Sequence, residues 1–244
     1  MIAVHKPKVQ NLENYSSGLT AHISGNFIAA AVPMLAALIS IPMLVSALGM
    51  EQYGLYVLLN IFLAYTSNFD FGIPKAIVRY YASGSDGDER RKVITVGFVL
   101  VLAIGLLGSL VFYFFATELS ELMVGGSSTL ANDFRETFIL ITYGYWLFLL
   151  STLSSALLHA KLKIRLVNGL QGIASTCMQL IPAIYCHLYS ADLVNAIALL
   201  LTIKTLQIIV MVGHLSSDLS LNLTAREFKF YVKNVVDYTK WLGP

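Results

Sequence analysis

Charged side chains are scarce in this chain of 244 residues. Asp, Glu, Lys and Arg make up only 12% of it, whereas hydrophobic residues make up 57%. Soluble domains carry roughly 25% charged residues, so the composition excludes an ordinary water-soluble protein. Uncharged runs long enough to cross a bilayer, which takes about 20 apolar residues, recur along the sequence. The composition therefore indicates a polytopic membrane protein.

The usual marks of an enzyme are also lacking. The longest loops between apolar runs, 75–92 and 118–136, are too short to hold a soluble catalytic domain. No Gly-rich nucleotide loop is found, and the five histidines have no metal-ligand spacing. The two cysteines, Cys177 and Cys186, lie nine residues apart on opposite faces of one predicted helix, which argues against a disulfide. We expect no enzymatic activity, no cofactor, no bound metal and no nucleic-acid partner.

Acidic residues are missing from the interior of the apolar runs. The acid closest to a span interior is Asp70, which lies at the inner end of the second run. Exporters that couple the efflux of cationic drugs to protons or sodium need a carboxylate within the helix bundle. The absence of one here favours an anionic cargo.

The apolar runs predict an all-α bundle of six membrane spans. The first span has its apolar part at Phe27–Leu48, and the other five lie at 52–69, 93–117, 137–160, 166–191 and 193–217. Residues 1–20 are polar, and the following run is too long for a cleavable signal peptide, so the first span is expected to remain as an anchor. The expected organisation is a cytoplasmic segment (1–20), a six-span lobe (21–213) and a cytoplasmic amphipathic linker with the start of a seventh span (214–244).

Basic residues occur on alternate loops. The N-terminus, the loops after spans two and four and the segment after span six hold thirteen of the sixteen lysines and arginines. Positively charged loops stay in the cytoplasm, so both ends of the six-span unit are predicted to be cytoplasmic. In the last segment Arg226, Lys229 and Lys233 recur at helical spacing beside aromatic residues, which predicts an amphipathic helix on the inner leaflet.

Lys204 is the one charge inside a span. It is the twelfth residue of the window between Asp192 and His214, about 16–18 Å from the outer end and near the middle of the bilayer. A lone cation at that depth costs about 2.5–3.5 kcal/mol on insertion scales. Two readings stay open: the ammonium faces a cavity that receives an anion, with Gln207 on the same face, or it reaches the interface by snorkelling.

A second cluster lies where span two meets the cytoplasm. Gly72 and Pro74 are expected to break the helix there, and Asp70 could fix the turn by pairing with Lys75 or Arg79. Lys75 and Arg79 are four residues apart and share a helix face, where they could bind a phosphate at the membrane surface. The alternative is that both are ordinary positive-inside anchors, with Asp70 as a cap or a partner.

Proline and glycine add two expectations about packing. Pro33 and Pro42 should bend span one, which indicates that this span faces protein or a cavity. Gly97, Gly105 and Gly108 lie near one face of span three and should let a neighbouring helix approach closely.

Three stretches resemble the N-terminal half of Wzx-type O-antigen and polysaccharide flippases, which share the MOP superfamily with MATE exporters. They are Leu48–Tyr56 (LGMEQYGLY), Asp70-Phe71-Gly72 followed by Arg79, and Leu158–Lys163 followed by Val167-Asn168. Pro42 also matches a proline late in span one. Pro74 departs from the family pattern, because many relatives have a small or aliphatic residue there.

The resemblance implies a transporter of an undecaprenyl-diphosphate-linked oligosaccharide in the bacterial inner membrane, with the N-terminus in the cytoplasm. Lys75 and Arg79 would gather the diphosphate, and Lys204 would neutralise it in the cavity. Membrane lipids and O-antigen polymerase machinery are the other expected partners. A member of this family has about twelve spans, so the chain is expected to hold only the first lobe. The alternatives are half of a MATE-type multidrug exporter, a non-transporting membrane scaffold and a truncated remnant.

Overall fold

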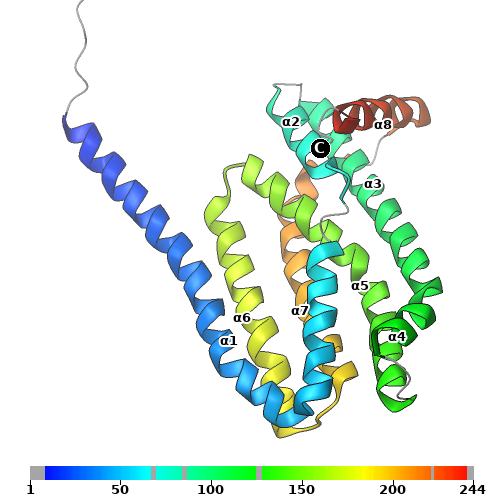
Figure 1. Cartoon of the computed structure of the whole chain (residues 1–244). Helices are drawn as coiled ribbons and strands as arrows, with labels where there is room; N and C mark the ends of the chain where they lie inside the picture. The colour runs from blue at the N-terminus through cyan, green and yellow to red at the C-terminus, as the bar shows by residue number, and fades with distance from the viewer. Residues whose placement is uncertain (1–8, 67–69, 84–86, 125–127, 221–222, 241–244) are drawn as a thin grey trace, which may run out of the picture.

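The computed structural model describes residues 9–66, 70–83, 87–124, 128–220 and 223–240. These residues form a helical bundle without a β-strand in the described ranges (Figure 1). The α-helices are α1 (Val9–Thr66), α2 (Ile73–Ala82), α3 (Gly87–Phe114), α4 (Ala116–Val124), α5 (Ser128–Ala160), α6 (Ile164–Leu188), α7 (Leu193–Gly213) and α8 (Ala225–Lys240), with a short 3₁₀ helix, η1 (Ser216–Asp218), after α7.

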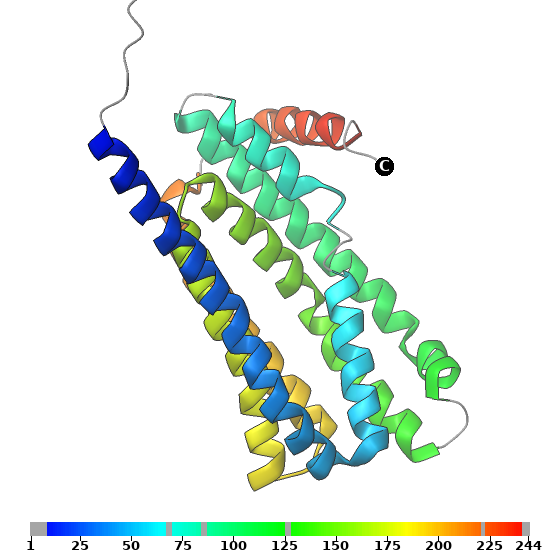
Figure 2. The ribbon, with the colours of Figure 1, turned by 60° about the vertical axis from the view of Figure 1, so that its left-hand side comes forward.

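The helix α1 consists of two arms that meet at Gly49. The backbone there has φ 77° and ψ 167°, which glycine adopts without the steric cost that a Cβ would add. The chain turns at this point, so that the second arm runs back beside the rest of the bundle (Figures 1 and 2). No other φ/ψ pair inside α1 is non-helical, so the backbone stays helical through Pro33 and Pro42. The turn between the first two spans therefore depends on glycine rather than on the two prolines.

Each of the six predicted spans corresponds to a helical segment. By length and composition, the described residues contain four helices able to cross a membrane: Ala31–Tyr65, Gly87–Phe114, Leu130–Ala160 and Leu193–Gly213. The first of these includes both arms of α1. The remaining predicted span corresponds to α6, which is 25 residues long but carries Asn168, Gln171 and Gln179 among its apolar residues and is not one of these four helices.

Small residues on α3 allow close contact with α5. A Cβ built on Gly105 would lie 2.5 Å from Cβ and 2.8 Å from Cα of Trp146, and one on Gly108 would lie 2.2 Å from Cε1 of Tyr145. Neither position has room for a methyl group, because real Cβ atoms do not approach other heavy atoms so closely. Gly97 faces Ile77 of α2 in the same way, at 2.9 Å. Gly105 and Gly108 therefore let α5 approach α3 closely, as predicted, whereas Gly97 faces a different helix, α2.

At one end of the bundle, α2, the start of α3 and α8 pack together (Figures 1 and 2). Tyr231 and Val235 of α8 are buried in the same hydrophobic cluster as Ile77 of α2 and Val93 of α3. The exposed side of α8 carries Arg226, Lys229 and Lys233, together with other polar residues. The prediction of an amphipathic helix is correct, but its buried apolar face is covered by protein. Of its large apolar side chains, Phe230 (58% exposed) and Val236 (42% exposed) remain on the surface.

Candidate functional site

Lys204 lies in α7, whose ends match the two residues that bracket the predicted window. Asp192 is the N-cap and accepts a hydrogen bond from the backbone N–H of Val194 at 3.0 Å, while His214 is the C-cap. The Lys204 ammonium donates to Oε1 of the buried Gln207 at 3.0 Å and lies 5.0 Å from the centroid of the Phe148 ring on α5. Among the described residues, these contacts include no carboxylate partner.

A cavity of about 410 Å³ lies beside this ammonium, between α5, α6 and α7. We call it the Lys204 cavity, and it is lined by Phe148, Ser151, Thr152, Ser155, Ala156, His159, Gln171 and Lys204. Gln171 of α6 donates to Ser155 Oγ of α5 at 3.0 Å, so part of the polar lining is already ordered. Lys204 is the only Lys, Arg, Asp or Glu among these lining residues. The arrangement suits an anion, because hydroxyl and amide donors surround one cation.

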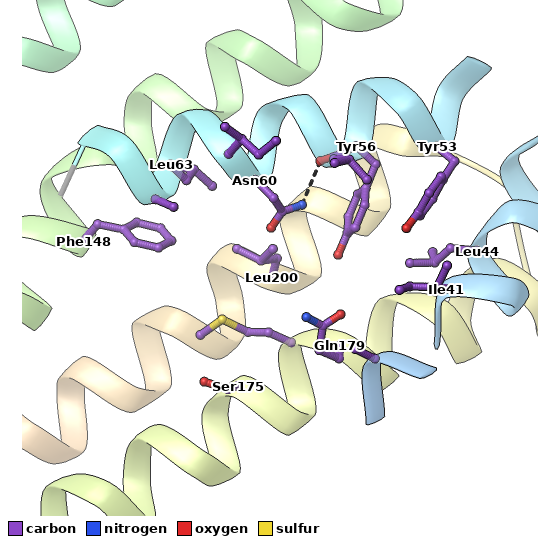
Figure 3. Close-up of a pocket in the computed structure, with 15 residues that line it drawn as sticks. Ile41, Leu44, Tyr53, Tyr56, Asn60, Leu63, Phe148, Ser175, Gln179 and Leu200 are labelled. Atoms are coloured by element: carbon purple, nitrogen blue, oxygen red, sulfur yellow. Dashed lines mark hydrogen bonds between the residues drawn. The ribbon is translucent and has the colours of Figure 1, made fainter. Parts of the chain in front are cut away.

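A second cavity, of about 430 Å³, lies between the two arms of α1 and the helices α5, α6 and α7 (Figure 3). We call it the α1 cavity. Its polar groups come from Tyr53, Tyr56 and Asn60 on the second arm of α1 and from Ser175 and Gln179 on α6. Phe148 lines both cavities. Ala37, Ile41 and Leu44 of the first arm also line the α1 cavity, so span one faces a cavity as predicted.

The turn before α2 is built as the sequence indicated. Gly72 adopts a left-handed conformation with φ 71°, and Pro74 follows in the first turn of α2. The Asp70 carboxylate accepts a hydrogen bond from the Gly72 N–H at 2.8 Å, which closes the turn directly. Asp70 therefore supports the turn through the backbone, whereas the predicted ion pair with Lys75 does not occur among the described residues.

Lys75 and Arg79 lie exposed on one face of α2. Neither residue lines the Lys204 cavity, so the three predicted substrate-binding cations do not meet in a single site in this structure. Lys75 and Arg79 are exposed on α2, which packs beside α8 at one end of the bundle (Figure 1). Lys204 instead lines the cavity between α5, α6 and α7.

The interior polar residues other than Lys204 and Gln207 were missed by the sequence reasoning. Ser151, Thr152 and Ser155 break the apolar run of α5, and Gln171 and Gln179 recur eight residues apart in α6. Polar residues inside a predicted span were the sequence signal that could have identified these lining residues. Phe148 has no such signal, because one aromatic residue in an apolar helix is indistinguishable from an ordinary packing residue.

A network of ion pairs joins the start of α3 to the start of α8. The Lys92 ammonium contacts Asp88 and Glu227 at 2.9 Å each. Glu227 also accepts the backbone N–H of Thr224 at 2.9 Å, which is the glutamate half of a capping box at the start of α8. Lys92, followed by Thr224, lowers the pKa of Glu227 from 4.5 to about 2. At the same end Lys161, after α5, pairs with Asp218 of η1.

Comparison with solved structures identifies the fold. A MOP superfamily transporter from Pyrococcus furiosus superposes with a TM-score of 0.65 at 15% identity, over 88% of this chain and 49% of the transporter. An outward-facing multidrug resistance MATE family transporter gives a TM-score of 0.63 at 17% identity, over 87% of this chain and 48% of that transporter. This is the MOP-superfamily transporter fold. The chain is an all-α, multi-pass membrane protein of that fold.

The sequence comparison agrees with this fold. A curated Shigella flexneri protein named as a candidate O-antigen transporter is 29% identical over 199 residues, which is 81% of this chain and 47% of the relative. The chain therefore spans about half the length of the relatives it matches. No protein-family model matches the sequence. The resemblance to O-antigen transporters with a MATE-like fold, stated from the three motifs, is confirmed.

Proposed function

We propose that this chain is the N-terminal lobe of a flippase that moves an undecaprenyl-diphosphate-linked oligosaccharide across the bacterial inner membrane, with its N-terminus in the cytoplasm. The observation that carries the proposal is the position of Lys204, a cation without a carboxylate partner among the described residues, beside a polar cavity in a transporter fold. A diphosphate supplies the missing negative charge. The likeness to an O-antigen transporter supports a lipid-linked glycan as the cargo.

The basic residues at one end of the bundle support the cytoplasmic orientation. Lys75 and Arg79 on α2, the basic residues exposed on α8 and the α5–α6 connection containing Lys161 gather at the end where α1 begins (Figure 1). In this proposal Lys75 and Arg79 hold the diphosphate near the inner headgroups, and Arg79 provides a two-pronged donor. Asp70 and Gly72 keep α2 in place, and Lys204 receives the anion further along its path.

The positive charge of Lys204 favours an anionic cargo over a cationic drug. A cationic cargo needs a carboxylate where this chain has Lys204. The structural likeness to the multidrug transporter concerns the fold and does not determine the sign of the cargo. The proposed work is translocation without a chemical reaction, in agreement with relatives that are transporters.

The test replaces Lys204 by Ala in the native gene and measures surface polysaccharide by gel and by antibody binding to intact cells. We expect at least a tenfold loss of surface polymer, with lipid-linked units accumulating inside. Lys204→Arg keeps the charge and should retain most of the polymer. Thr202→Ala, at an exposed site on the same helix, is the matched control. Normal surface polymer in Lys204→Ala cells with unchanged protein levels would rule out this role.

A further inference from the structure

We infer that the α1 cavity is a binding site for an uncharged saccharide ring. Its volume of about 430 Å³ lies within the roughly 300–1,000 Å³ of small-molecule sites. The described residues that line it include no Lys, Arg, His, Asp or Glu, in contrast to the Lys204 cavity. The inference rests on the proposed function for its connection to transport, although the site itself is argued from its own geometry.

The polar groups converge on the cavity from two helices. The hydroxyls of Tyr53 and Tyr56 point from the second arm of α1 toward α6, and the Gln179 amide points back toward Tyr56 (Figure 3). Asn60 donates its Nδ2–H to the backbone carbonyl of Tyr56 at 2.8 Å, which fixes the side chain and leaves Oδ1 as an acceptor. Hydroxyl groups of a ligand would therefore meet both donors and acceptors.

Gln179 is only weakly engaged within the protein. Its Oε1 accepts from Ser40 Oγ at 3.4 Å, at the long end of hydrogen bonding, and its Nε2 has no partner among the described residues. An amide N–H that points into a cavity within a membrane bundle destabilises the protein unless a water or a ligand accepts its hydrogen bond. A hydroxyl-bearing ligand supplies that partner, and a hydrocarbon chain does not.

The aromatic residues favour a sugar over a smaller polar solute. Tyr53 and Tyr56 are stacked, with ring centroids 6.4 Å apart and an interplanar angle of 24°. Aromatic side chains with a hydroxyl offer an apolar face and a hydrogen-bonding edge together. A sugar ring has the matching pair, C–H faces and hydroxyl edges. The uncharged lining gives an isolated anion or cation no counter-charge.

The position of Phe148 connects this site to the anion site. Because Phe148 lines both cavities, the two are adjacent. One molecule that carries a sugar next to a phosphate could place the sugar in the α1 cavity and the phosphate at Lys204. The first arm of α1 supplies the outer wall of the sugar site through Ala37 and Ile41.

The inference is tested with the full chain in lipid nanodiscs. Saturation-transfer NMR measures binding of the methyl glycosides of hexoses, N-acetylhexosamines and 6-deoxyhexoses. We expect at least one class to bind and expect Asn60→Leu, Gln179→Leu and Tyr53→Phe each to weaken its binding at least fivefold. Ala37→Leu, which fills the cavity without removing a polar group, should weaken it as well. Tyr65→Phe, on the same arm but outside the cavity and 68% exposed, is the matched control and should bind as the parent does.

Three results would overturn the inference: no signal from any glycoside class, binding that survives both amide substitutions and the filling variant, or equal binding of methylcyclohexane. Helical circular dichroism and monodisperse elution establish that each variant is folded. The readout is also separate from the cellular test of Lys204. Glycoside binding with normal surface polymer in Lys204→Ala cells would leave the saccharide site in place and reject the proposed role of Lys204 in transport. Loss of polymer in those cells, together with no glycoside binding by the purified chain, would support the role of Lys204 and reject the saccharide site.

Discussion

The Lys204 ammonium lies 5.0 Å from the centroid of the Phe148 ring, at the boundary between the two cavities. Within the described part of the chain, the ammonium makes this ring contact and a hydrogen bond to Gln207. A cation over an aromatic face gains about 0.5–1 kcal/mol, and more where water is excluded. An anion that draws the ammonium away from the ring must replace that energy.

Phe148→Leu is therefore expected to tighten the binding of an anionic lipid. The substitution removes the ring contact from the unliganded protein, and a loss of about 0.5–1 kcal/mol corresponds to roughly two- to fivefold higher affinity. The probe is undecaprenyl phosphate, titrated into the chain in nanodiscs and followed by native mass spectrometry. Phe148→Tyr retains the ring and should leave the affinity unchanged. Weaker binding by Phe148→Leu would mean that the ammonium stays on the ring when the anion is bound.

Gly105→Ala should destabilise the bundle. The added methyl would lie 2.8 Å from the Cα of Trp146, so the α3–α5 contact must open rather than a side chain rotate. Overpacking of this kind costs about 1–3 kcal/mol. Thermal unfolding in detergent, followed by circular dichroism, measures the loss.

The matched control for this substitution is Gly54→Ala, since a Cβ at Gly54 meets nothing within 4 Å. It should unfold at the parent temperature or slightly above, because alanine favours a helix more than glycine does. Equal stability of Gly105→Ala and the parent would show that α3 and α5 can separate at little cost.

The turn before α2 distinguishes a backbone role of Asp70 from a charge role. Asp70→Asn keeps an oxygen to accept the Gly72 N–H and should retain stability, while Asp70→Ala removes it and should cost about 0.5–1.5 kcal/mol. Gly72→Ala should cost about 1–2 kcal/mol, because φ is 71° there. Protease protection of the segment around α2, together with thermal unfolding, reports both effects. A large loss in Asp70→Asn would instead indicate that the negative charge itself is required.

The attachment of α8 is expected to depend on acidity through Glu227. Folding lowers the pKa of this carboxyl from 4.5 to about 2, mainly because Lys92 bonds to it. A lowered carboxyl pKa stabilises the folded state above the unfolded value, and this contribution is lost as the pH falls from about 4.5 to about 2. The protection factors of the 225–240 backbone in hydrogen exchange, which are corrected for the intrinsic slowing of amide exchange in acid, should therefore fall over that range.

The control for the acid effect is Glu227→Gln, which cannot titrate. Its protection factors in α8 should already be low at neutral pH and should change little as the pH falls through the same range. Lys92→Met should raise the exchange at neutral pH in the same way, since it removes the main cause of the lowered pKa of Glu227. Unchanged exchange in both variants would show that Tyr231 and Val235 alone hold α8 in place.

Hydropathy and charge along the sequence by themselves determine much of this protein. Apolar length determines where helices cross a bilayer, because the cost of exposing backbone groups to lipid depends on local composition. The six helical segments, the turn at Asp70–Gly72, the glycine face of α3 and the caps of α7 at Asp192 and His214 all follow from local signals. The position of Lys204 in the middle of α7 also follows from counting along its helix.

Only the tertiary structure decided what those helices enclose. Which face of α5 meets α7, and how far the arms of α1 separate, depend on helix rotation and crossing, which hydropathy does not encode. Phe148 therefore could not be recognised as the residue common to both cavities, nor Asn60 and Gln179 as residues that line one of them from two different helices. The apolar face of α8 shows the same limit, since its composition suits lipid or protein equally. The packing onto α2 and α3 resolves that ambiguity in favour of protein.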